Sequence, residues 1–467
     1  MELFSRILIN VSDFIYVYIL CGLLVACGLY FTFKTKFAQI SLFSDAIKFT
    51  TEKSKKDKVS SFQALMLCTA SKVGTANIAG IASAIVLGGP GAIFWIWAVA
   101  IIGAASSMAE ATLAQIYKKR SKDGSFFVGG PAYYIKNALG QKWLGTTFAI
   151  LLVFCFLVGF NALQAHNMSM AFETFIPNYL QTFWPWLIGG IFATLIGSVI
   201  LGGVKRIGLI ISYVVPIMAS IYLLMGIFTT LMNIQKVPHM FSLIFQDAFN
   251  FKAISGGFAG SVLVMGIKRG LLSNEAGMGS APNSAATADT SHPIKQGIAQ
   301  ILSVTIDTFL ICTTSAFIIL LSGVDLSGKI QDGVPLMQHA ISLQVGNWGK
   351  YFVLFSLAIF AFSAILGNFG VSEPNILFIK NSPKLAKTIR IISIIPIIFG
   401  CVVGYKIVWN LAEIAMALIA IVNIISILLL SKKFMICLKD YLKQKKSGKD
   451  PVFKGKDCGF ENLDYWD

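Results

Sequence analysis

Two glycine-interrupted stretches inside apolar segments decide the fold of this chain. The first reads Thr69-Ala70-Ser71-Lys72-Val73-Gly74-Thr75-Ala76-Asn77-Ile78-Ala79-Gly80. The second reads Gly266-Ile267-Lys268-Arg269-Gly270-Leu271-Leu272-Ser273-Asn274-Glu275-Ala276-Gly277-Met278-Gly279. Bare backbone polar groups are costly in lipid, so an unwound segment at mid-depth must line a cavity or a ligand. The alternative is that these glycines only let helices pack closely, as small residues often do.

The composition of the whole chain places these stretches in a membrane protein. The 467 residues are 56% hydrophobic and 13% charged, whereas soluble domains carry about 25% charged residues. A water-soluble globule needs polar cover that this chain lacks. The same numbers exclude a disordered chain, a collagen-like rod and a disulfide scaffold. We therefore predict an all-α, polytopic membrane protein.

Apolar segments long enough to span a bilayer recur eleven times. They lie near residues 13–33, 62–88, 91–117, 143–170, 186–204, 207–232, 253–285, 293–322, 350–371, 389–405 and 407–431. The first is expected to be a retained span rather than a signal peptide, because its apolar run continues beyond Cys27. Without it, ten spans divide into two sets of five, and an interrupted segment opens each set. Matched interruptions in two halves are the best sequence indication of a transporter's binding site.

These sets predict four parts of the chain. An extra N-terminal helix and a basic loop occupy residues 1–58, and a first five-helix repeat occupies residues 59–232. A second repeat follows at 233–431, and a Lys-rich tail at 432–467. We expect the tail to be a solvated cytoplasmic extension that touches anionic headgroups, with no chemistry of its own.

The positive charge is explained by membrane topology. Segment 34–58 holds seven Lys and segment 432–456 holds nine, whereas the connections expected on the other side hold only Lys236, Lys252 and Lys329. The positive-inside rule then puts the N-terminus outside and the C-terminus inside the cytoplasmic (inner) membrane. The net charge of +16 therefore needs no nucleic-acid partner, and no basic helix or aromatic-interleaved sheet indicates one.

Other functional classes lack their signatures. The eight cysteines and four histidines are dispersed, so we predict no disulfide, no metal cluster and no cofactor beyond a coupling ion. No catalytic motif indicates an enzyme, and no repeated filter indicates a channel. Transport remains as the predicted function.

Several longer motifs resemble those of the alanine/glycine:cation symporter family, the sodium:alanine symporters. They lie at residues 88–95, 109–114, 129–134 and 268–282, followed by His292-Pro293 and Gln296-Gly297. The resemblance covers roughly residues 60–430. It implies a fold like that of the bacterial leucine transporter, with inverted five-helix repeats, two discontinuous helices and alternating access. It also implies uptake of a small neutral amino acid, alanine or glycine first, with sodium, by a monomer. A transporter of the same fold for another amino acid or small solute stays open as an alternative.

The resemblance also implies site residues, residue by residue. The substrate site is expected to contain Lys72, Gly74, Thr75, Gln164, Leu272, Asn274 and Asn368. The cation sites are expected to use the carbonyls of Ala70 and Val73 with Ser363, and the side chains of Asn77 and Asp307.

Three further ionisable residues are interpreted as gating or structural groups. Glu110 is expected to cap a helix or to pair with the basic residues at 118–120. Arg269 and Glu275 flank the second interruption and are expected to hold each other.

Lys72 leaves two interpretations open. A lysine at mid-membrane is costly without a partner, and Asp307 is the partner we expect. In the simpler interpretation this pairing is structural and sodium coupling is unchanged. In the alternative, the Lys72 ammonium replaces a sodium ion or contacts the substrate carboxylate, and transport is coupled to protons.

Overall fold

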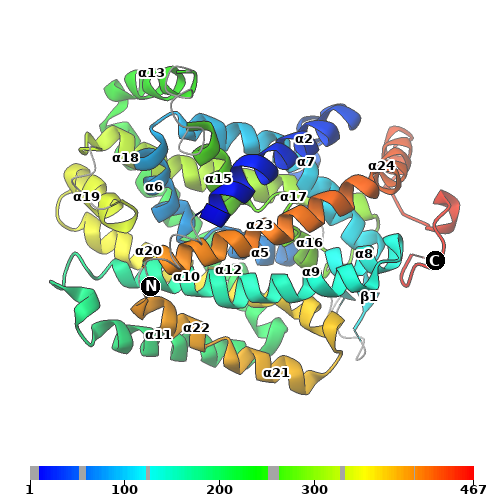
Figure 1. Ribbon diagram of the computed structural model, residues 1–467. Helices are drawn as coiled ribbons and strands as arrows, with labels where there is room; N and C mark the ends of the chain where they lie inside the picture. Colours follow the sequence, from blue (N-terminus) through cyan, green and yellow to red (C-terminus); the bar gives the residue numbers. More distant parts are fainter. Residues whose placement is uncertain are drawn as a thin grey trace.

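The computed structural model describes residues 10–51, 59–121, 127–250, 262–326, 332–403 and 405–466, and these are almost wholly helical (Figure 1). Helices satisfy the backbone where a bilayer offers no water. Within the described residues, eight helices are long and apolar enough to cross a membrane, or nine if one bent pair is a single span. They are Asn10–Lys34, Ala92–Ile116, Lys142–Met170, Arg206–Met232, Pro293–Ser322, Gly349–Ile379, Lys384–Val402 and Ala412–Leu429, and the bent pair is Ser61–Lys72 with Ala76–Gly88.

The other two predicted spans are helical but do not meet that length. The fifth is α11 (Trp184–Ile200), an apolar helix of 17 residues. The seventh, predicted near residues 253–285, divides into α15 (Val262–Asn274) and α16 (Ala281–Ala285). Its first residues lie outside the described part of the chain.

The elements before residue 250 begin with the N-terminal helix and end with a helix outside the bundle. In chain order they are η1 (Tyr16–Leu20), α2 (Cys21–Lys34), α3 (Ala38–Ser41), α4 (Phe43–Thr50), α5 (Ser61–Lys72), η2 (Ala76–Gly80), α6 (Ile81–Gly88), α7 (Ala92–Ile116), β1 (Lys119–Arg120), β2 (Phe127–Val128), α8 (Pro131–Leu139), α9 (Lys142–Phe154), η3 (Cys155–Phe160), α10 (Asn161–Met170), η4 (Tyr179–Gln181), α11, α12 (Gly203–Met232), η5 (Ile234–Lys236) and α13 (Val237–Ala248).

The elements after residue 262 begin with the second interrupted helix. They are α15, α16, α17 (Pro293–Val304), η7 (Thr305–Cys312), α18 (Thr313–Ser322), α19 (Val334–Val345), α20 (Gly349–Ile379), α21 (Pro383–Ile392), α22 (Ile395–Val402), α23 (Tyr405–Leu429), α24 (Ser431–Lys446) and η8 (Lys456–Cys458). Four of the described elements, η1, η2, η3 and η7, are π-helical turns. Such turns occur often at functional sites. Here η2 contains Asn77, η7 contains Asp307, and η3 precedes the helix that contains Gln164.

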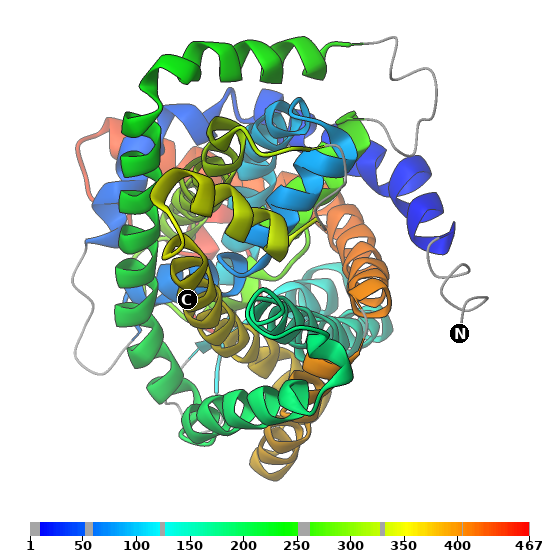
Figure 2. The ribbon, with the colours of Figure 1, turned by 90° about the vertical axis from the view of Figure 1, so that its left-hand side faces the viewer.

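The connections gather at two opposite ends of the bundle. In Figure 1, β1, α8 and α24 lie at the right-hand end, and α13 and α19 lie at the left-hand end. Figure 2 looks from the left-hand end, with α12 along one side and α13 across the top. The connections expected in the cytoplasm therefore share one end. Which side of the membrane that end faces remains a prediction from the Lys and Arg pattern.

The interrupted helices sit at the centre of this packing. Helix α7 packs against α15, α17 and α2, and α20 packs against α5. The contact between α20 and α5 is possible because residue 367 is glycine, where a Cβ atom would lie 2.5 Å from the Ser71 nitrogen. At its other end α5 is fixed by a capping box, in which Ser60 and Gln63 bond each other's backbone N–H.

The C-terminal tail is folded onto the bundle, so the expected solvated extension is wrong. The Phe453 N–H donates to the Ser291 carbonyl at 2.9 Å, and the Trp466 indole donates to the Gln115 carbonyl at 2.7 Å. Phe453 and Trp466 are buried, as are Phe460 and Leu463 between them. The prediction failed because it rested on the Lys content of the tail and did not consider the apolar side chains spaced along it.

Candidate functional site

The first interruption leaves backbone donors that side chains satisfy. Residues 73–75 separate α5 from η2, and the two parts of the span are bent by 54°. The Gly74 N–H donates to Asn77 Oδ1 at 3.2 Å. The Thr75 N–H and its hydroxyl both donate to Gln164 Oε1, each at 2.7 Å. One amide oxygen from η3–α10 therefore receives two donors at the start of the second half-helix, where the helix dipole is positive.

A side chain at residue 74 would displace the amide of Gln164. A Cβ atom there would lie 2.4 Å from Gln164 Nε2 and 2.8 Å from Oε1. Gln164 is held by its bonds to Thr75, and Asn167 also donates to the Thr75 hydroxyl at 3.0 Å. The glycine thus permits direct contact between the first interrupted helix and α10.

The second interruption is held by a carboxylate and an amide from two other helices. Three residues here have positive φ: Glu275 at 53°, Gly277 at 81° and Gly279 at 85°. Glycine adopts this conformation without the steric cost that other residues have. The N–H groups of Gly277 and Gly279 donate to the Glu110 carboxylate at 3.4 and 3.1 Å. Asn423 donates to Glu110 at 2.7 Å and to the Gly277 carbonyl at 2.9 Å.

Glu110 therefore caps unwound backbone, which is one of its two expected roles. The cap is on the second interruption rather than on the helix of Glu110 itself. Its expected partner Lys118 donates to the Ala288 carbonyl at 2.9 Å and lies 4.3 Å from the centroid of the Phe127 ring.

Asp307 joins the two interruptions. Asn77 Nδ2 donates to Asp307 Oδ1 at 2.5 Å, and the Ser273 hydroxyl donates to Oδ2 at 2.5 Å. Thr308 donates to Oδ2 at 3.1 Å. All these donors are neutral, and Asp307 is fully buried. Among the described residues no Lys, Arg or His lies within 4.0 Å of its carboxylate. The groups around the Asp307 carboxylate are thus an amide nitrogen and two hydroxyls, and Cys312 Sγ lies 3.0 Å from the Ser273 hydroxyl.

Lys72 does not pair with Asp307, so that expectation is wrong. The Lys72 side chain is 2% exposed, and its Nζ has no hydrogen-bond partner among the described residues. Its charge interacts at longer range with Glu110, Glu275 and Asp307. The direct bonds of Asp307 go to neutral groups instead, which leaves the ammonium free for another acceptor.

Arg269 and Glu275 do not hold each other, contrary to expectation. Arg269 Nη1 binds Glu413 Oε1 at 3.0 Å, and Lys268 Nζ binds Glu413 Oε2 at 3.2 Å and Asp13 at 3.0 Å. Glu275 accepts a hydrogen bond from the neighbouring Ser280 instead. The pair of basic residues therefore ties the second interrupted helix to α23 and to the N-terminal helix.

The side chains of the remaining expected substrate residues, Asn368, Asn274 and Leu272, form no hydrogen bond with Asp307, Gln164 or Glu110 in the described part of the chain. Asn368 Oδ1 accepts from the Ser71 hydroxyl at 2.9 Å, and its Nδ2 donates to Asn161 at 2.9 Å. Asn274 accepts from the Ala276 N–H at 3.0 Å, and its Nδ2 has no hydrogen-bond partner among the described residues. Leu272 is buried on α15.

Ser363 is less directly connected to the expected cation site. Its hydroxyl donates to the Phe360 carbonyl at 3.1 Å and to Met218 Sδ at 3.2 Å. It lies one turn before the glycine at 367, which packs on the backbone of Ala70. Its coordination with the carbonyls of Ala70 and Val73 remains a prediction.

Sequence reasoning missed Ser273, Thr308 and Asn423. Asn423 is a lone amide in an apolar run, Ile421-Val422-Asn423-Ile424-Ile425, and such a residue in a span is a signal for a buried polar contact. Ser273 was inside the quoted stretch but gave no sign of its partner.

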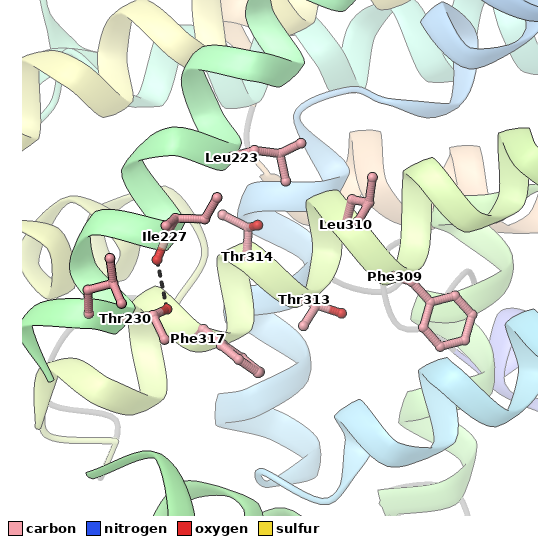
Figure 3. Close-up of a pocket in the computed structure, with 10 residues that line it drawn as sticks. Leu223, Ile227, Thr230, Phe309, Leu310, Thr313, Thr314 and Phe317 are labelled. Atoms are coloured by element: carbon pink, nitrogen blue, oxygen red, sulfur yellow. Dashed lines mark hydrogen bonds between the residues drawn. The ribbon is translucent and has the colours of Figure 1, made fainter. Parts of the chain in front are cut away.

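An apolar groove lies elsewhere, between α12 and α18 (Figure 3). It has a volume of about 370 Å³ and is lined by hydrocarbon side chains such as Leu223 and Phe317, with three threonines. Its Thr230 hydroxyl is already bonded to the Gly226 carbonyl at 2.7 Å. The groove holds none of the polar groups described above and does not suit a zwitterionic or charged solute.

Comparisons with known proteins agree on one family. Residues 1–455 match the sequence profile of the sodium:alanine symporter family. The amino-acid carrier protein AlsT of Bacillus subtilis (strain 168) is 44% identical, covering 100% of this chain and 99% of AlsT. The probable sodium/glutamine symporter GlnT of the same organism is also 44% identical, covering 95% and 91%. The sodium/proton-dependent alanine carrier protein of Bacillus sp. (strain PS3) is 34% identical, covering 90% and 96%.

A solved structure supports the fold. The crystal structure of MhsT in complex with L-phenylalanine matches with a TM-score of 0.55 at 15% identity, covering 81% of this chain and 90% of MhsT. The predicted leucine-transporter-like arrangement of an all-α membrane protein is therefore confirmed. At this identity the match shows the fold alone.

The contact between Gly74 and Gln164 gives a first prediction. Gly74→Ala forces Gln164 away from Thr75 and breaks their hydrogen bonds, at a cost of about 1–3 kcal/mol in the free energy of unfolding. Thermal unfolding of the purified protein in detergent measures this loss. Gly22→Ala is the control, because a Cβ atom at Gly22 meets nothing within 4 Å. Equal unfolding temperatures for the two variants would contradict the contact.

Proposed function

This chain belongs to the sodium:alanine symporter family, and on that premise we propose that it imports alanine or glycine together with sodium by alternating access. The chain is a cation-coupled amino-acid transporter with several membrane spans, and not an enzyme. The substrate, the ion and the residues that bind them are the proposed part.

The observation that carries the substrate proposal is the pair of donors on Thr75. Its N–H and hydroxyl converge on one acceptor oxygen, that of Gln164. A substrate carboxylate offers the same acceptor chemistry with a full negative charge, which the start of a half-helix favours. In our proposal the carboxylate takes these donors, and the Gln164 amide turns to the substrate's ammonium or carboxylate. The proposed substrate set is Lys72, Gly74, Thr75, Gln164, Leu272, Asn274 and Asn368.

The cation proposal rests on Asp307. Its buried carboxylate has only neutral donors within reach, and a sodium ion would balance its charge with hard oxygen ligands. In the proposal Asn77 turns its amide oxygen to the ion, since an amide can accept as well as donate. The proposed cation set is Ala70, Val73, Asn77, Asp307 and Ser363.

The setting of the protein is also proposed. We infer that the protein lies in the inner membrane with the N-terminus outside and the C-terminus inside, on the basis of the Lys and Arg distribution. A monomer is proposed as the transporting unit. The end that carries β1, α8 and α24 in Figure 1 is then cytoplasmic.

Uptake by purified protein in proteoliposomes tests the substrate and the ion together. We expect saturable uptake of labelled alanine and glycine that requires an inward sodium gradient. Asp307→Asn removes the charge that balances the ion. It should raise the sodium concentration that gives half-maximal uptake about 10- to 100-fold, because a charged contact contributes about 1.5–3 kcal/mol.

Asp457→Asn is the matched control, since Asp457 is exposed in the tail. It should leave uptake unchanged. Saturable uptake of glutamine without alanine or glycine uptake would overturn the substrate assignment. Unchanged sodium dependence in Asp307→Asn would overturn the ion site.

A second candidate, proton coupling through Lys72, is favoured by one observation. The Lys72 ammonium is buried without a hydrogen-bond partner among the described residues, within electrostatic range of three carboxylates. A lysine that gains and loses its proton there would supply and withdraw a positive charge, as a coupling ion does.

Uptake with sodium removed and an inward proton gradient separates the two candidates. Proton coupling predicts that the native protein still accumulates alanine and that Lys72→Thr does not, while Lys142→Thr, at an exposed position, behaves as native. If the native protein takes up no alanine without sodium, proton coupling is excluded and sodium coupling is retained.

A further inference from the structure

A small polar pocket lies outside the proposed transport site, at the end of the bundle that carries β1, α8 and the tail. It has a volume of about 170 Å³ and lies among the β1–β2 hairpin, α8 and the end of α20. Among the residues that the structure describes, its charged lining side chains are Lys119, Arg120 and Lys136, and none of its lining residues there is a carboxylate. The amides of Asn137 and Asn381 complete its polar wall. Three cations with neutral donors form a site for an anion rather than for a zwitterion.

One of the three cations, Lys119, is already paired with a carboxylate. Asp464 of the tail binds Lys119 Nζ at 2.9 Å, and both side chains are partly exposed. Exposed ion pairs contribute little stability, about 0–1 kcal/mol, so a phosphate that contacts all three cations can displace this carboxylate. Arg120 lies over the Tyr465 ring at 5.8 Å and Lys136 over the Phe378 ring at 5.8 Å. Both cations are exposed and retain donors for a ligand.

The ends of the neighbouring spans place the pocket at the depth of lipid headgroups. Helix α20 ends at Ile379, and α9 begins at Lys142. Ile379, which follows the lining residue Phe378, is 39% exposed, and Trp143 in the first turn of α9 is 67% exposed. Exposed tryptophans are typical of the membrane–water interface. The two helices meet here, because a Cβ atom at Gly145 would lie 3.3 Å from the Phe378 ring.

We propose that this pocket binds the phosphate-bearing headgroup of an anionic phospholipid through Lys119, Arg120 and Lys136. Arg and Lys are the residues that bind phosphate in proteins, and basic pockets at the ends of spans bind anionic headgroups. Free phosphate offers the same chemistry. The depth of the pocket and the apolar side chains beside it favour the lipid.

The bound headgroup would lie where the two halves of the chain meet. The Tyr133 hydroxyl on α8 donates to the Pro374 carbonyl on α20 at 2.9 Å, and the Tyr133 and Phe378 rings are 5.0 Å apart. The lipid therefore bridges α8 and α20, and it competes with Asp464 for Lys119. Through that competition its binding loosens one contact of the tail.

Native mass spectrometry of the full-length protein in detergent tests the proposal. Phosphatidylglycerol is added to the native protein, to the variant K119Q/R120Q/K136Q and to the control K432Q/K439Q/K443Q. The control removes the same charge from exposed positions on α24 at the same end of the bundle. We expect the pocket variant to bind about 100-fold more weakly, at about fivefold per cation. The control should bind as the native protein does, and phosphatidylethanolamine should bind more weakly to the native protein.

Three results would overturn the proposal. The first is a pocket variant that binds the lipid as tightly as the native protein does. The second is a control variant that loses as much affinity as the pocket variant, which would indicate general attraction to basic surfaces. Displacement of the lipid by excess inorganic phosphate would assign the pocket to free phosphate. If the triple variant does not elute as a folded monodisperse protein, Lys136→Gln alone replaces it, with about a fivefold loss expected and an unchanged affinity as the contradicting result.

Discussion

The buried carboxylate of Asp307 is hydrogen-bonded to both interrupted helices. It accepts from Asn77 in the first interrupted helix and from Ser273 in the second. An ionised carboxylate removed from water is costly unless it is hydrogen-bonded and its charge is balanced. The neutral donors supply the hydrogen bonds but not the opposite charge. This requirement would link the packing of the helices to the proposed binding of a cation at Asp307.

The two interruptions obey the same constraint on the backbone. Unwound N–H groups at mid-depth cannot be left bare, and each interruption is satisfied by a side chain from another helix. Gln164 serves the first, and Glu110 serves the second with Asn423. Exchanging one hydrogen-bond acceptor for another changes the free energy little, whereas losing the acceptor costs about 1–3 kcal/mol. The side chain at the first interruption can therefore give way to a substrate carboxylate at small cost.

The positions of the interruptions were predictable because their cause is local. Glycine and asparagine in an apolar run indicated both segments, and the breaks lie within them, at residues 73–75 and after Asn274. The charged residues were a poorer guide, because Lys268 and Arg269 lie inside the continuous helix α15. The ion pairs were not predictable for the opposite reason. Arg269 finds Glu413 across 144 residues, and no local pattern distinguishes Glu413 from Glu275 as its partner. The expected Lys72–Asp307 pair failed because opposite charge was considered without the neutral donors of Asn77 and Ser273. The tail was misjudged because its Lys content hid the spacing of its buried aromatic residues, such as Trp466.

Amide hydrogen exchange, read by mass spectrometry at residues 73–76 and 275–280, tests most directly whether the two interruptions act as one site. The protein is compared in detergent with and without alanine and sodium added together. If Asp307 couples the two helices, exchange slows in both segments at the same ligand concentrations. Slower exchange in only one segment, while alanine binds with sodium, would contradict a shared site.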